Sequence, residues 1–247
     1  MERPEFIEVL STEARLFADA VGRAEPGTPV PTCPEWTVRD LALHLGTVHR
    51  WAAGMVREGR TEPVRPSPPD GLADEALAPW LREGAELLVE VLEAAPEDLD
   101  CWTFLPSRSA AAFWTRRQAH ETAVHRVDAE AALGAPLSPL PAGFAADGVD
   151  ELLCGFYPRR GTPEGFAADP RTLHLRATDV AGAAWTAVLG DPARAERATA
   201  PPAAPDCVYE GTAQDLYLAL WNRLPLSELT LSGEVSVAHR WREVFRP

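Results

Sequence analysis

The feature that most constrains the fold is a helical spacing of apolar residues that fills most of the first 134 positions. Apolar side chains recur every three or four residues, a repeat that places them on one face of an α-helix. The spacing predicts four helices, at residues 5–23, 38–59, 74–95 and 111–134. Because each predicted helix has an apolar face to bury, the segment as a whole predicts a four-helix bundle.

Residues that start or stop helices separate these segments. Thr37 precedes the second helix, and Asp40 three residues later completes an approximate capping box, in which each side chain accepts from a backbone N–H group. The proline-rich segment 61–71 cannot be helix or central strand, because proline removes a backbone donor. Gly134 closes the fourth helix, and the short apolar patch 101–105 is predicted to be extended.

The pattern changes in the last 100 or so residues. Three segments alternate apolar and polar residues with period two, as strands do, and a further segment has helical spacing. The strand-like segments are 171–178, 183–190 and 229–235, and the helical one is 212–224. The predicted fold class is therefore α+β, with a four-helix bundle at residues 1–145 and a small α+β domain at residues 146–247.

Charge and hydropathy exclude some classes of partner. The chain has 23 basic and 37 acidic side chains, and its net charge of −14 repels nucleic-acid phosphates and anionic lipids. It has no run of about 18 apolar residues, so we expect no membrane span. Acidic residues lie near its start, where a secretory signal would be basic, so we expect a cytoplasmic protein. Its four cysteines are scattered without a C-x-x-C pair, so neither a zinc knuckle nor a redox motif is indicated.

The fourth predicted helix carries the candidate chemical groups. Glu121 and His125 are four residues apart, so they lie about 40° apart on one helix face and can share a ligand. Arg117 and Asp128 are on the same face, which permits simple ion pairing, although Asp128 could also orient a ligand. Taken alone, such a face is more often solvated than metal-binding. His120 points about 100° away from Glu121, into the apolar stripe, and is expected to be a hydrogen-bonded core histidine.

A histidine on the second predicted helix changes this balance. His44 lies among apolar residues on the inward face, whereas His49 is about 140° away, at the edge of that face. Burying an imidazole without a partner costs about 1 to 3 kcal/mol, so His44 needs an acceptor or a metal. His44, Glu121 and His125 together would leave a zinc ion an open fourth position, which is the arrangement of a catalytic site.

Two stretches of the sequence resemble a known family. PEWTVRDLALHLGTVHRWA at 34–52 and RRQAHETAVHRVDAE at 116–130 resemble the mycothiol-dependent maleylpyruvate isomerase family. The resemblance implies a DinB-type four-helix bundle that binds a divalent metal, usually zinc. The ligands that it implies are a histidine eight residues after the tryptophan of the first stretch, and a Glu and a His four residues apart on the last bundle helix. In this chain they are His44, Glu121 and His125.

The resemblance also implies an activity. In the isomerase, the thiolate of mycothiol adds to the cis double bond of maleylpyruvate, the resulting single bond rotates, and elimination gives the trans product. The family's small C-terminal domain carries an arginine implicated in activity, and LALWNRLP is similar to that region, which places the arginine at Arg223. Arg223 would hold a substrate carboxylate, and a surface arginine is the alternative. The continuation from His125 to Asp128 resembles an actinobacterial branch of the family, so the electrophile stays open, as does the choice between isomerase and S-transferase.

Two further interpretations stay open beside the metal-dependent enzyme. A metal-free bundle could bind small molecules or regulate, with the three side chains as a hydrogen-bonded polar cluster. Cys33, just before the second predicted helix, could be a nucleophile or a small packing residue. The expected cofactors are zinc and mycothiol, the expected partner is a small electrophile, and the chain is expected to be a monomer or a homodimer.

Overall fold

The computed structural model describes residues 1–160, 166–198 and 204–244. Its contacts divide the chain into two compact units, Met1–Ser138 and Pro139–Pro247. The first unit is helical and the second contains a five-stranded sheet, so the predicted α+β fold class is confirmed. Among the described residues, no helix combines the length and the apolarity that crossing a bilayer requires.

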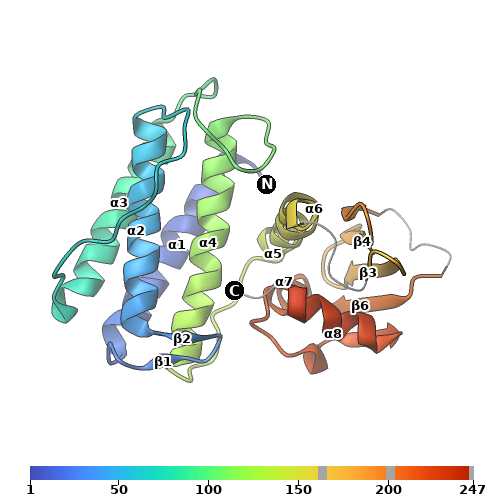
Figure 1. Cartoon of the computed structure of the whole chain (residues 1–247). Coiled ribbons are helices and arrows are strands. Elements are labelled where there is room, and N and C mark those ends of the chain that lie inside the picture. The colour runs from blue at the N-terminus through green and yellow to red at the C-terminus, as the bar shows by residue number, and fades with distance from the viewer. Residues whose placement is uncertain (161–165, 199–203, 245–247) are drawn as a thin grey trace. The chain divides into compact units, whose positions relative to one another are not determined.

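The first unit is the predicted four-helix bundle (Figure 1). Its helices are α1 (Arg3–Arg23), α2 (Val38–Arg57), α3 (Leu77–Ala94) and α4 (Ala110–Ala132). Helices α1 and α2 each pack against both α3 and α4. The apolar faces meet in a core in which Phe17, Leu41 and Leu81 are buried. Each large side chain withdrawn from water in this way contributes about 1.5 to 3 kcal/mol to the folded state.

The ends of these helices follow the signals in the sequence. At the start of α2, the Thr37 side chain accepts from the backbone N–H of Asp40, and the Asp40 carboxylate accepts from the backbone N–H of Thr37 at 2.9 Å. The bonds from Thr37 lower the pKa of Asp40. Ser109 caps α4 by accepting from the Ala112 N–H at 3.1 Å. Gly134 follows α4 with φ of 62°, a left-handed conformation that glycine adopts with little steric cost.

The segment 101–105 is not the extended strand that the sequence predicted. It has no regular structure, and the Trp102 N–H donates to the carbonyl of Arg60 at 2.8 Å. The rings of Trp102 and Phe104 pack with Trp114 of α4, with centroids 6.4 Å and 6.3 Å from it. The apolar character of the segment therefore reflects burial against the bundle and not pairing within a sheet.

Helix α4 carries buried charged residues. Arg126 is fully buried, and it donates from Nε to Glu13 of α1 at 2.6 Å and from Nη1 to Glu130 at 2.7 Å. A short antiparallel hairpin, β1 (Pro29–Val30) and β2 (Cys33–Thr37), leads into α2, and β1 packs against α4. The buried Arg126 therefore bonds to carboxylates of α1 and α4 instead of to water.

The sheet of the second unit has the strand order β5-β4-β3-β6-β7, with β3 and β6 parallel and the other neighbours antiparallel. Its strands are β3 (Arg171–Ala177), β4 (Ala184–Leu189), β5 (Arg194–Arg197), β6 (Cys207–Gly211) and β7 (Thr230–Gly233). Alternation in the sequence predicted β3, β4 and β7. It missed β5 and β6 because neither sequence alternates: β5 has a single apolar residue, and β6 begins with Cys207, Val208 and Tyr209 in a row.

Helices pack against this sheet and against one another. They are α5 (Ala142–Asp150), a π-helix (Glu151–Phe156), α6 (Tyr157–Arg160), α7 (Ala213–Leu220) and α8 (Val235–Val244). Helix α7 is the predicted helix 212–224, although it ends at Leu220, and α7 and α8 both pack against β3 and β6. The domain boundary expected after residue 145 falls inside α5.

Helix α5 was not predicted because glycine disfavours helix interiors, and α5 contains two glycines. One of them, Gly148, has a packing role. A Cβ atom at this position would lie 2.4 Å from the ring of Tyr217 in α7, so only glycine permits the close approach of the two helices.

Candidate metal centre

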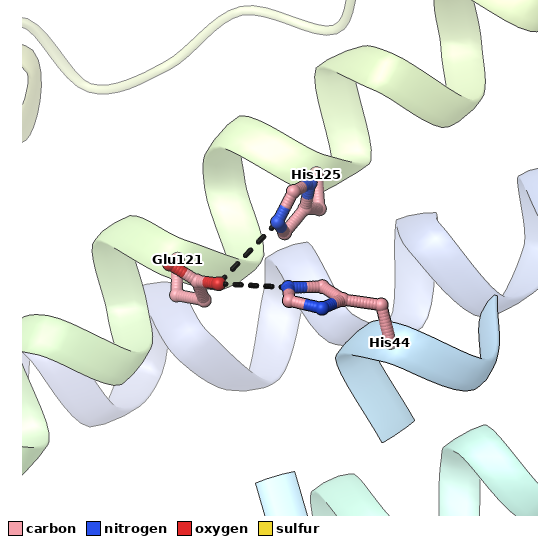
Figure 2. Close-up of side chains that lie close together, drawn as sticks. All are labelled: His44, Glu121 and His125. Carbon is pink, nitrogen blue, oxygen red and sulfur yellow. Dashed lines mark hydrogen bonds and ion pairs between the residues drawn. The ribbon is translucent and has the colours of Figure 1, made fainter. Parts of the chain in front are cut away.

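Three side chains from two helices of the first unit meet at one point (Figure 2). His44 extends from α2, and Glu121 and His125 lie one turn apart on α4. Nε2 of His44 is 3.2 Å, and Nε2 of His125 is 3.3 Å, from the same atom, Oε1 of Glu121. One candidate ligand atom from each residue lies within 4.8 Å of the other two. The fold therefore brings together the three residues that the sequence singled out.

The two nitrogen–oxygen separations suit a tetrahedral ion. Zinc bonds of about 2.0 to 2.1 Å place neighbouring ligand atoms of a tetrahedron about 3.3 Å apart. Two imidazole nitrogens and one carboxylate oxygen are donors that zinc accepts, and three protein ligands leave a fourth position for another molecule. The residues present thus fit a divalent metal. The same separations are also hydrogen-bond lengths, so they are compatible with a metal-free polar cluster as well.

Arg117 holds the second oxygen of Glu121. Its Nη2 donates to Oε2 at 2.9 Å, and its side chain is only 4% exposed. Burial alone would raise the pKa of Glu121, but hydrogen bonds from His125 and His44 and the positive charge of Arg117 lower it well below its usual range. Glu121 is therefore ionised, and Oε1 is the oxygen that faces the histidines. The sequence placed Arg117 on this face but gave no sign that its side chain would be buried.

His125 is held from its other side by Asp128. Nδ1 of His125 is 2.9 Å from Oδ2 of Asp128, whose side chain is fully buried. Burial alone would lower the pKa of His125, but the hydrogen bonds to Asp128 and Glu121 and their negative charges raise it to about 9. Metal binding at Nε2 would therefore release a proton. Between the two roles that the sequence left open for Asp128, the structure shows contact with the candidate ligand His125.

Trp36, at the end of the hairpin, packs on both histidines. Its ring centroid is 4.9 Å from that of His44 and 6.0 Å from that of His125, and the two imidazoles are themselves 4.9 Å apart. Trp36 is stacked on His125 and tilted against His44, so it contacts both imidazole rings. Sequence reasoning used Trp36 only as part of a family stretch, and nothing in helical spacing predicts that a residue preceding a helix folds back over it.

The other two bundle histidines lie in the core. His49 was predicted at the edge of its helix face but is only 1% exposed, because α4 covers that side of α2. The Thr122 hydroxyl donates to the Gln118 carbonyl and accepts from Nε2 of His49 at 2.8 Å. Burial lowers the pKa of His49 to about 3, so its ring is neutral. His120 is fully buried with its ring edge against Phe6, as expected of a core histidine.

The remaining candidates occupy different environments. Cys33 is buried, and its Sγ lies 3.7 Å from Oδ2 of Asp128. Arg223 lies in the second unit, where its backbone N–H donates to the Leu218 carbonyl at 2.7 Å and closes the end of α7. Its Nη1 donates to the Trp221 carbonyl at 2.8 Å, and the residue is 8% exposed. The role of Arg223 as a carboxylate ligand stays a prediction.

These features define a class of protein, with a helical bundle that carries a His–Glu–His candidate metal centre and a second unit built on a mixed sheet. The chain belongs to the mycothiol maleylpyruvate isomerase family. Residues 8–130 match the model of the mycothiol maleylpyruvate isomerase N-terminal domain, and residues 143–240 match that of the MDMPI C-terminal domain. No curated protein matches the sequence.

Two solved structures share the fold. One is the mycothiol-dependent maleylpyruvate isomerase, with 15% sequence identity and a TM-score of 0.63. The other is a histidine-to-alanine mutant of a protein of that name, with 14% identity and a TM-score of 0.62. Each comparison covers 94% of this chain and 93% of the other. The likeness therefore extends over both units.

Proposed function

We propose that this protein is a metal-dependent enzyme that uses mycothiol to attack a small electrophile. One observation carries the proposal: His44, Glu121 and His125 converge within 4.8 Å of one another, and both nitrogen–oxygen separations suit a tetrahedral divalent ion. Membership of the mycothiol maleylpyruvate isomerase family supports the choice of thiol. We propose zinc as the ion, because the nitrogen and oxygen donors suit it and three protein ligands leave an open position.

The side chains around the centre have distinct roles in this proposal. When bound, the ion would supply the positive charge that keeps a thiol deprotonated at neutral pH. His44 and His125 would hold it through Nε2, and Glu121 through Oε1. Arg117 retains Oε2 of Glu121, so the carboxylate offers a single atom and a position stays free. Trp36 covers the two imidazole rings and excludes water from that side.

The proposed isomerisation regenerates the thiolate. The thiolate sulfur forms a C–S bond with one carbon of an activated cis double bond, and the electron pair moves onto the conjugated carbonyl group. The remaining C–C single bond rotates, the electron pair returns, and the C–S bond breaks to release the trans product and the thiolate. If a proton instead adds to carbon, the thiol conjugate is released and the protein is an S-transferase. We propose Arg223 as the ligand of a substrate carboxylate, because a guanidinium forms paired hydrogen bonds with it.

We also propose a cytoplasmic location and no nucleic-acid partner. The net charge of −14 supports the second statement, because it repels phosphate backbones. The substrate is proposed only as a small electrophile, and the protein as a monomer or a homodimer.

A second function is a metal-free bundle that binds a small molecule or regulates without catalysis. The observation in its favour is that Glu121 has hydrogen-bond donors without an ion. Arg117 and His44 lie 2.9 Å and 3.2 Å from its two carboxylate oxygens. A cluster satisfied in this way is stable without an ion.

Elemental analysis and turnover measurements distinguish the two functions. Protein purified without chelator is analysed for divalent metal, and is then incubated with mycothiol and a panel of electrophiles that includes maleylpyruvate. We expect about one zinc per chain, and either isomerised product or thiol conjugate. His44→Ala should lose the metal and the turnover while its circular dichroism is unchanged, and His239→Ala, an exposed histidine of the second unit, is the matched control. A wild-type protein that neither contains zinc nor takes it up would refute the enzyme and favour the binding module.

A further inference from the structure

Asp128 is a buried carboxylate with a donor on each oxygen. Its side chain is fully buried on the inner part of α4. Oδ1 accepts from the Thr32 hydroxyl at 2.6 Å, and Oδ2 accepts from Nδ1 of His125 at 2.9 Å. The Cys33 thiol also donates to Oδ2, at 3.7 Å. A buried carboxylate is costly unless hydrogen bonds satisfy it, and these contacts supply that compensation.

The contact with His125 determines which of its ring nitrogens is available. A carboxylate can only accept, so Nδ1 of His125 carries the proton that is donated to Asp128. The ring then presents Nε2 to Oε1 of Glu121, 3.3 Å away, which is the side on which His44 also lies. Neutral imidazole has a lone pair on one nitrogen alone, so a proton fixed on Nδ1 places that lone pair on Nε2.

The hairpin fixes Asp128 in turn. Thr32 is in the two-residue turn between β1 and β2, and Cys33 is the first residue of β2. The hairpin is joined to the start of α2, because the Val38 N–H donates to the Thr28 carbonyl at 2.9 Å. Two donors to Asp128 therefore come from a segment that is almost a hundred positions away in the sequence and is anchored to the helix that carries His44.

We propose that Asp128, held by Thr32 and Cys33 of the hairpin, is a positioning residue that selects Nε2 of His125 as the metal ligand. A carboxylate that orients a ligand histidine in this way typically changes metal affinity by about 10-fold to 100-fold. The inference rests on the proposed metal centre for its effect on affinity. Its effect on the histidine ring does not depend on a metal and can be measured separately.

The first test uses metal-free protein at a pH above about 9, where the His125 ring is neutral and carries a single proton. Long-range ¹H–¹⁵N spectra of the histidine rings report which nitrogen of His125 carries the proton. We expect Nδ1 of His125 to be protonated and bonded in the wild type, and we expect Asp128→Ala to lose that preference. Thr32→Val, which removes one donor to Asp128 and leaves the carboxylate in place, should shift the same signals less. Unchanged His125 signals in both variants would overturn the proposal.

The second test measures zinc affinity by competition with a chelator. We expect Asp128→Ala to bind zinc about 10-fold to 100-fold more weakly than the wild type. Asp128→Asn keeps an acceptor oxygen and should lose less. Glu130→Gln is the matched control, because Glu130 is also a buried carboxylate of α4 but bonds to Arg126 and Ser138, and this variant should keep wild-type affinity.

The outcomes separate the two proposals. If the wild type binds no zinc, the proposed function fails, while the ring signals of His125 in the metal-free protein still decide the role of Asp128. If the wild type binds zinc, and both Asp128→Asn and Asp128→Ala bind it with wild-type affinity, Asp128 serves only the fold. If Asp128→Ala does not fold, Asp128→Asn and Thr32→Val provide the same two measurements.

Discussion

The buried His49 makes the stability of the bundle depend on pH in a calculable way. Its pKa is about 3 in the folded protein, against about 6.5 for a histidine exposed in the unfolded chain. Below pH 6.5 the unfolded state therefore binds a proton that the folded state does not. The contribution of this neutral ring is fully present above about pH 6.5 and is lost as the pH falls toward 3.

The size of the effect follows from these two pKa values. Between pH 7 and pH 5 the unfolded histidine becomes protonated while the folded one stays neutral, and linkage gives a loss of about 2 kcal/mol in the free energy of unfolding. His49→Gln removes the titrating ring and keeps a donor for the Thr122 hydroxyl. We expect the variant to lose about 2 kcal/mol less stability than the wild type over this interval.

Urea unfolding of chelator-treated protein, followed by circular dichroism at several pH values, measures the difference. Other titrating groups are common to both proteins, so their contributions cancel when the two free-energy curves are subtracted. His239→Gln is the control, because it also removes a histidine but leaves the bundle unchanged, and it should follow the wild-type curve. If His49→Gln loses as much stability as the wild type between pH 7 and pH 5, His49 is not a buried neutral ring.

Three further predictions concern the bundle, each measured by urea unfolding at neutral pH. Arg126→Met should destabilise the protein by about 3 to 5 kcal/mol, because it leaves two buried carboxylates without their shared cation. Gly46→Ala should destabilise the protein by about 1 to 3 kcal/mol, because the added Cβ would lie 2.1 Å from the Trp80 ring. Gly54→Ala, on the same helix, is the matched control: its Cβ meets no atom within 4 Å, and it should stabilise the protein by about 0.5 to 1 kcal/mol. Thr37→Ala should cost about 1 kcal/mol through loss of the α2 cap, and an unchanged midpoint would contradict the capping assignment.

The bundle was predictable because its signals are local. Helical spacing needs only neighbouring residues, and the capping box of Thr37 and Asp40 is complete within four positions. The same is true of Glu121 and His125, whose four-residue spacing alone puts them on one face. Strands β5 and β6 were missed because neither sequence alternates, since β5 is mostly exposed with a single apolar residue and β6 begins with three apolar or aromatic residues in a row.

The sequence by itself predicted the four bundle helices, α7, the cap of α2, and the candidate ligands His44, Glu121 and His125, because spacing along each helix is a local property. Only the tertiary structure decided that His49 is buried, that Arg117 and Asp128 hold the candidate ligands, and that Trp36 stacks on the imidazoles. These contacts join α2, α4 and the hairpin. The spacing of apolar residues within one helix does not specify which neighbouring element covers each of its faces. Packing between elements therefore decides burial, and burial decides the charge and orientation of the groups in the centre.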